Sequence, residues 1–159
     1  MPPTTTSRQP LGLKPDFAVS RSILATLQYI EQFELGRGRD GRAAKLLGSG
    51  SAALEFKRFL ALPLLYPGRQ EYPFVPSLRL DLLWHTFLLD TPRYREFCER
   101  VYGQYLDHVP GKSRSETKRA VRLGPMQFTV QSITQAFDGV NRRYWSEAAF
   151  CGPCLLFIE

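Results

Sequence analysis

Five side chains in this sequence are of the types that bind metal ions or act as nucleophiles. Two histidines and three cysteines occur among 159 residues: His85, Cys98, His108, Cys151 and Cys154. Cys151 and Cys154 form the tetrapeptide Cys-Gly-Pro-Cys. Two thiolates at this spacing commonly supply half of a tetrahedral zinc site. The pattern therefore predicts a metal site that draws its other ligands from elsewhere in the chain.

The same tetrapeptide occurs in thiol oxidoreductases, but its surroundings here disfavour a redox role. A thioredoxin-type Cys-x-x-Cys follows a strand and begins a long helix, whose N-terminus lowers the pKa of the first thiol. Only five residues follow Cys154, and four of them are apolar. No alternation of strands and helices precedes the motif. A thioredoxin-like activity is therefore not expected.

Residues 77–108 are predicted to form an antiparallel helical hairpin. Ser77 is a favourable N-cap for the first helix, and Thr91 followed by Pro92 is a typical start for the second. The two helices would meet at a very short turn around Asp90. If the second helix is broken, Gly103 is the position where the break costs least, because glycine adopts backbone conformations that other residues avoid.

Chemically active side chains lie on this hairpin at spacings that predict a shared, inward-facing side. Asp81 and His85 are four residues apart and fall on one face of the first helix. Cys98 and His108 fall on the apolar side of the second helix, together with aromatic residues. Folding the hairpin about its turn predicts that His85 lies level with Cys98. A buried Asp beside a His needs a partner or a ligand, because an unpaired buried charge loses its hydration.

Three interpretations of these residues are open. The first is a site for zinc or a similar metal, formed by Cys151, Cys154 and His85 and completed by Cys98 or His108. The second is a buried Asp81–His85 pair with a purely structural role. The third is catalysis, with Cys98 as a nucleophile that His85 activates and Asp81 orients.

The segment from Ser51 to Pro110 resembles a family of uncharacterised glycine-rich domain-containing proteins, with a weaker likeness from Ile133 to Trp145. The residues that carry the resemblance are Pro76, Ser77, Asp81, Trp84, His85, Thr91, Tyr94, Phe97, Cys98, Gly103, His108 and Pro110. The glycine-rich tail and the second Trp-His repeat of the plant members are missing, and Asp107 stands where many relatives have a further His. The roles suggested for plant members, in stress signalling or RNA binding, therefore do not transfer to this chain.

The remaining segments predict an all-α fold with one domain. Residues 1–15 are expected to be a flexible arm and residues 16–159 a compact helical domain. Helices are predicted from about Asp16 to Gly36, from Ser51 to a limit at Pro63, and from about Pro125 to Phe137. The tail, residues 150–159, is expected to cover the core with three apolar residues, Leu155, Leu156 and Phe157. Trp84 is the expected packing anchor, and Tyr144 and Trp145 are expected to dock the tail.

Charge and hydropathy restrict the partners. The net charge of +6 is concentrated in residues 36–45 and 111–122, but acidic residues interrupt both segments. Nucleic-acid binding is therefore a weaker alternative. No apolar run could span a membrane or serve as a secretory signal, so we expect a cytoplasmic protein. The sequence favours a binding or interaction module for a protein or small molecule, stabilised in one interpretation by zinc. The alternative is a small metal- or cysteine-dependent enzyme.

Overall fold

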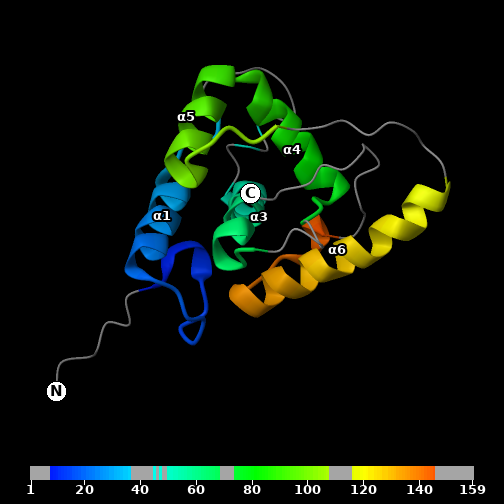
Figure 1. Cartoon of the computed structure of the whole chain (residues 1–159), viewed down its shortest axis with the longest axis horizontal. Coiled ribbons are helices and arrows are strands. Elements are labelled where there is room, and N and C mark those ends of the chain that lie inside the picture. The colour runs from blue at the N-terminus through cyan, green and yellow to red at the C-terminus, as the bar shows by residue number, and fades with distance from the viewer. Residues whose placement is uncertain are drawn as a thin grey trace.

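The predicted all-α fold is confirmed by a computed structural model (Figure 1). It describes residues 8–36, 45, 47, 50–68, 74–107 and 116–145, with the backbone alone for residues 116–125. The helices are α1 (Arg21–Gln32), α3 (Gly50–Leu65), α4 (Leu78–Leu89), α5 (Thr91–Tyr102) and α6 (Glu116–Ala136), with two short 3-10 helices, η1 (Pro10–Gly12) and η2 (Arg142–Tyr144). The described ranges contain no extended strand, and Leu13 and Phe137 form an isolated antiparallel bridge.

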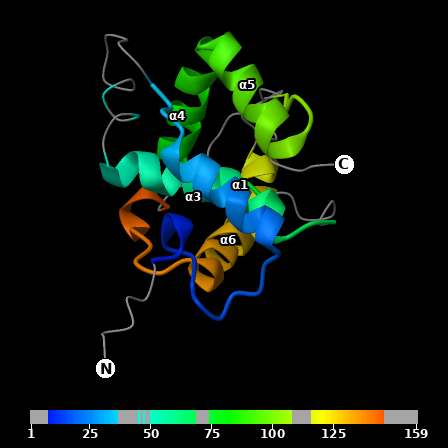
Figure 2. The ribbon, with the colours of Figure 1, turned by 90° about the vertical axis from the view of Figure 1, so that its left-hand side faces the viewer.

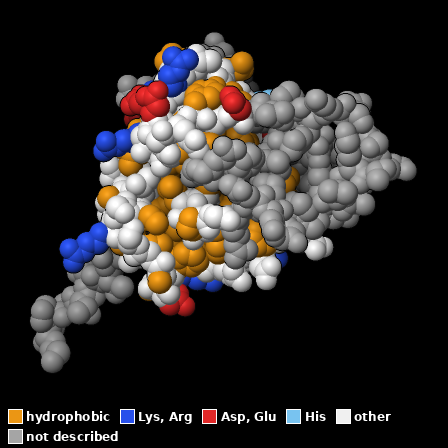
Figure 3. All heavy atoms as spheres, viewed as in Figure 1, with side chains coloured by type: hydrophobic (Ala, Val, Ile, Leu, Met, Phe, Trp, Pro, Cys, Tyr) orange, Lys and Arg blue, Asp and Glu red, His pale blue; other side chains and the backbone are white. Residues whose placement is uncertain are grey.

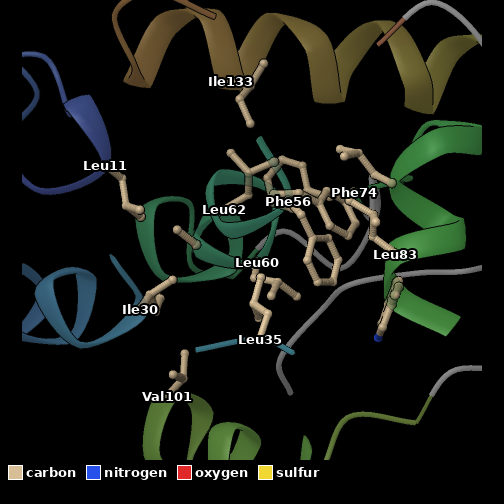
Figure 4. Packing of buried hydrophobic residues seen from close by; sticks show 14 of the residues in the cluster. Leu11, Ile30, Leu35, Phe56, Leu60, Leu62, Phe74, Leu83, Val101 and Ile133 are labelled. Carbon is tan, nitrogen blue, oxygen red and sulfur yellow. The ribbon is translucent and has the colours of Figure 1, made fainter. Parts of the chain in front are cut away.

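Helix α3 lies at the centre of the domain. It contacts η1, α1, α4 and α6, so most of its side chains are buried (Figures 1 and 2). Figure 4 shows the core around it, to which every major helix contributes. The labelled residues include Leu11, Ile30, Phe56, Leu60, Leu62, Leu83, Val101 and Ile133. Apolar side chains also reach the surface on the face shown in Figure 3, beside scattered charged residues.

Polar caps determine where several helices begin and end. The Ser20 hydroxyl accepts a hydrogen bond from the Ile23 amide at 3.2 Å and caps α1. The predicted Ser77 cap is confirmed, since its hydroxyl accepts from the Leu80 amide at 3.2 Å. Gly103 ends α5 in the left-handed conformation, with φ of 71°. Glycine adopts this conformation without the Cβ clash that other residues suffer.

The predicted bounds of three helices are wrong. The first helix begins only after Ser20, whose hydroxyl satisfies its first turn, and it ends at Gln32 rather than at Gly36. Helix α3 continues past Pro63 to Leu65, because a proline near a helix end removes a single backbone hydrogen bond. Helix α6 begins at Glu116, well before Pro125.

Helices α4 and α5 form the predicted hairpin (Figure 1). Asp90 closes α4 and serves as the N-cap of α5, one residue earlier than predicted. The hairpin packs against α3 through an edge-to-face contact between Phe59 and Trp84, whose ring centroids are 5.7 Å apart. The Tyr102 hydroxyl also donates to the Leu60 carbonyl at 2.6 Å. Trp84 is fully buried, as its predicted role as an anchor requires.

The prediction of a flexible arm over residues 1–15 is wrong for its last part. Leu11 and Leu13 are buried in the core, and Leu13 pairs with Phe137 after α6. Gly12 has φ of +72°, and a Cβ placed there would lie 2.8 Å from a guanidinium nitrogen of Arg58. The positive φ favours glycine at this position, and an added Cβ would displace the Arg58 guanidinium from its hydrogen bonds. Proline and serine content alone did not reveal these anchoring leucines.

The membrane prediction concerns helix length and hydropathy. Throughout the described ranges, none of the helices combines the length and apolar character that a bilayer span demands.

Candidate functional site

Asp81 and His85 form a close pair on α4. The Nδ1 atom of His85 lies 2.7 Å from the backbone oxygen of Asp81 and 3.2 Å from its carboxylate Oδ2. Both oxygens are acceptors, so Nδ1 carries the hydrogen and donates it. The carboxylate side chain is only 6% exposed, whereas the imidazole is 45% exposed. The pair therefore spans the boundary between the core and the surface.

The prediction that His85 points into the hairpin is wrong. Helix α4 is apolar on two sides, and the side that packs against the core carries Leu80, Leu83, Trp84 and Phe87. Asp81 lies at the edge of that buried side, and His85 lies one turn further on, toward solvent. The structural interpretation of the pair is thus kept in a modified form: Asp81 orients a half-exposed imidazole rather than a buried one.

Cys98 lies in the hydrophobic core, not beside a catalytic base. Its side chain is fully buried. Burial raises the pKa of the thiol, although hydrogen bonds with the Leu106 backbone and the Tyr94 side chain oppose this. The Tyr94 hydroxyl accepts from the Trp84 indole at 3.1 Å and donates to the Leu106 carbonyl at 2.8 Å. Cys98 is therefore part of a buried polar network, which favours a neutral, unreactive thiol.

The cysteine-nucleophile hypothesis consequently lacks its geometry. A catalytic thiol must be accessible and must meet a base within hydrogen-bond reach. Cys98 is inaccessible, and the imidazole of His85 is bonded to Asp81 on the solvent side of α4. We expect Cys98 to resist a small alkylating agent in native protein and to react only as the chain unfolds, because its burial excludes the reagent. Mass spectrometry of the labelled peptides measures this, and rapid labelling of Cys98 under native conditions would contradict it.

The zinc prediction is untested. Cys98, one of its possible ligands, lies in the apolar core. Among the residues that the structure describes, no three His, Cys, Asp or Glu side chains are grouped closely enough to hold a metal ion. His108, Cys151 and Cys154 lie outside the described residues. A zinc site that combines them with His85 stays a prediction.

The outward side of α4 is unusually apolar. Leu78, Leu82, His85 and Leu89 fall within an arc of about 60° at the helical repeat of about 100° per residue, and we call this set the α4 outer face. The leucines are 42%, 48% and 70% exposed, respectively. A surface helix normally presents polar residues to solvent, whereas a contiguous apolar patch indicates contact with another surface. This face is the most prominent apolar feature on a described helix.

Sequence reasoning missed a buried ion pair between Glu55 and Arg58 on α3. Their side chains are 2% and 4% exposed, and the Arg58 Nη1 lies 2.8 Å from Glu55 Oε1. Arg58 also donates to the backbone oxygens of Leu11 at 2.8 Å and Asp138 at 2.7 Å. Glu55 accepts from the Trp145 indole at 2.9 Å. The pair thus joins both ends of the described chain to α3.

This ion pair could have been suspected from one signal. Glu55 and Arg58 stand three residues apart within an otherwise apolar helical segment. The same spacing is common on solvated helix faces, where it stabilises little. Only the neighbours supplied by η1 and η2 show that the pair is buried. Its polar atoms are used to hold the fold together, so it is a structural centre rather than a reactive one.

The described part of the chain also has an open cleft of about 400 Å³ between η1, α1 and α3. The Lys57 ammonium donates to the Glu31 backbone oxygen at 2.6 Å. Burial lowers the pKa of Lys57, and the negative charges of nearby glutamates partly offset this lowering. The Glu31 carboxylate in turn accepts from the Leu11 amide at 3.0 Å. These polar groups bond to one another, which favours a structural role over small-molecule binding.

The basic segments behind the nucleic-acid prediction are mostly outside the described side chains. In residues 36–45 and 111–122, Lys45 is the only basic residue whose side chain is described. Nucleic-acid binding therefore stays a prediction.

Comparison with known proteins gives a partial match to one family model and no assigned role. Residues 48–124 match the profile of the UCP032817-like family. This match covers just under half of the chain and includes α3, α4 and α5 in full. No curated protein and no solved structure matches the chain significantly. The segment that resembles the glycine-rich domain-containing family lies inside the matched residues, and that resemblance stays a prediction.

Proposed function

We propose that this protein is a helical interaction module that binds an apolar helical segment of a partner protein through the α4 outer face. The observation that carries the proposal is the row of exposed leucines around His85 on a helix whose opposite side is firmly packed in the core. A rigid helix that presents apolar residues at positions i, i+4 and i+11 is suited to dock against another amphipathic helix. Residues on a fixed element also lose little conformational freedom on binding.

His85 adds a polar contact at the centre of this surface. Its ring is oriented by Asp81 through Nδ1, so the imidazole is held in place before a partner arrives. Aromatic or polar anchors surrounded by apolar residues commonly carry most of the binding energy in protein interfaces. A donor group on the partner, such as a hydroxyl or an amide N–H, would complement this imidazole, because Nε2 of the neutral ring accepts a hydrogen bond when Nδ1 carries the hydrogen. Enzymatic function receives no comparable support from the described residues.

We expect substitution of Leu82 by Glu to weaken partner binding by at least about tenfold, because it places a charge in the middle of the apolar row. Peptides selected from a library of amphipathic helices on the full chain provide the ligand, and fluorescence polarisation measures the affinity. The matched control is Gln28→Glu, which adds the same charge to an exposed position on α1. Both variants should keep the wild-type melting temperature, since neither position is buried.

The proposal also predicts two properties of the selected peptides. They should share apolar residues at helical spacing, and they should compete with one another for binding. If no peptides are enriched, or if the enriched peptides bind the Leu82→Glu variant as tightly as the wild type, the α4 outer face is not the binding surface.

A further inference from the structure

The described chain ends in the core, near the buried side of α4. Trp145, the last described residue, is buried. Its ring packs against the Phe59 ring of α3, with the two ring centroids 6.3 Å apart. Trp84 of α4 contacts the same Phe59 ring from another direction at 5.7 Å. The two indoles thus share a neighbour in the core. The chain that follows Trp145 therefore starts toward the buried side of α4, opposite the side that carries the exposed leucines.

Fourteen residues follow Trp145, numbered 146–159. At about 3.3 Å per extended residue, the ten residues from Trp145 to Leu155 can span up to about 33 Å. The row from Leu78 to Leu89 is only about 16 Å long at 1.5 Å per helical residue. The length of this segment is therefore ample for it to pass around α4 and lie along its outer side.

The composition of residues 150–159 matches the α4 outer face. The run Leu155, Leu156, Phe157 and Ile158 is apolar, and apolar side chains favour burial against an apolar surface. Glu159 follows this run, whereas Arg79 is exposed near the N-terminus of α4. An acidic side chain is favoured at a helix N-terminus and beside an arginine. This charge complementarity orients the segment antiparallel to α4.

We propose that residues 150–159 dock in cis on the α4 outer face and compete there with the partner helix. This inference rests on the proposed function, because it assigns a regulator to the same surface. In the antiparallel orientation Leu155, Leu156 and Phe157 lie along Leu78 and Leu82. Cys151 and Cys154 then lie near His85 and Leu89.

The first test traps the docked segment covalently in the full chain. Leu89→Cys introduces a thiol where the inference places Cys151 and Cys154, and Gln28→Cys on exposed α1 is the control. Dilute protein is oxidised mildly with oxidised glutathione, and peptide mass spectrometry measures intramolecular disulfides. We expect at least about tenfold more disulfide to Cys151 or Cys154 from position 89 than from position 28, because proximity raises the effective concentration. Equal yields at the two positions would overturn the inference.

A second test changes the segment rather than α4. Replacing Leu155, Leu156 and Phe157 by Ser in the full chain should reduce trapping at position 89 to the level of the Gln28→Cys control. The peptide selection is carried out in parallel on this variant, which should bind the selected peptides at least about fivefold more tightly, because its own segment no longer competes. Unchanged trapping and affinity would overturn the inference.

The two proposals fail in distinguishable ways. Trapping requires no peptide, so equal yields contradict docking of the segment whatever the peptides do. Peptides that bind the wild type and the serine variant equally, and that depend on Leu82, support the proposed function while removing its regulation. Absence of peptide binding to both chains contradicts the proposed function directly.

Discussion

Replacing Arg58 by Met is expected to cost about 3–5 kcal/mol of unfolding free energy. The substitution leaves the Glu55 carboxylate charged and without its guanidinium partner in a nearly inaccessible position. It also removes the donors to the backbone oxygens of Leu11 and Asp138, so the segments around η1 and after α6 lose their shared attachment to α3. Urea denaturation monitored by circular dichroism measures the loss.

Two further variants identify the cause of this effect. Arg95→Met removes an exposed arginine from α5 and should change stability by less than about 0.5 kcal/mol. The double variant Glu55→Gln with Arg58→Met should cost less than the sum of the single variants, because the buried charge is removed together with its partner. If Arg58→Met is no more destabilising than Arg95→Met, the ion pair is not a structural centre.

Replacing Trp84 by Ala is the second large change, with an expected loss of about 3–5 kcal/mol. Trp84 is fully buried, it packs edge-to-face on Phe59, and its indole donates to the Tyr94 hydroxyl. The substitution opens a cavity between α3 and the hairpin and removes one member of the polar network around Cys98. Thermal unfolding should therefore begin at a clearly lower temperature than in the wild type.

Leu82 provides a matched comparison on the same helix. Leu82→Ala also shortens an apolar side chain of α4, but this residue is 48% exposed, so its loss should cost well under about 1 kcal/mol. Trp84→Phe should fall between the two alanine variants, because it keeps a ring but loses the indole donor. Equal melting temperatures for Trp84→Ala and Leu82→Ala would mean that the two sides of α4 are interchangeable, and the fold described above would be wrong.

Together these experiments separate the two sides of α4. The side that carries Trp84 determines whether the hairpin stays attached to α3, whereas the side that carries Leu82 is proposed to bind a partner. A substitution that changes binding without changing stability belongs to the second side. This distinction allows the proposed function to be tested on protein that is fully folded.

Local signals in the sequence were sufficient for the secondary structure of the hairpin. The Ser77 cap, the turn at Asp90 and the glycine at position 103 act through neighbouring backbone groups. They therefore need no knowledge of the rest of the fold. The all-α class follows from helical spacing of apolar residues, which is also a local property. Trp84 could be chosen as an anchor because its large apolar surface is rarely left exposed.

Tertiary structure alone decided which groups are buried. Helix α4 has apolar residues on two sides, so its periodicity could not distinguish the side that packs on α3 from the side that carries His85. Glu55 and Arg58 have the spacing of an ordinary surface pair, and only the backbone oxygens of distant segments make their burial tolerable. Leu11 and Leu13 stand in a proline-containing segment, yet contacts with residues after α6 hold them in the core. Burial depends on neighbours that are remote in the chain, and the spacing of residues within one helix does not specify those neighbours.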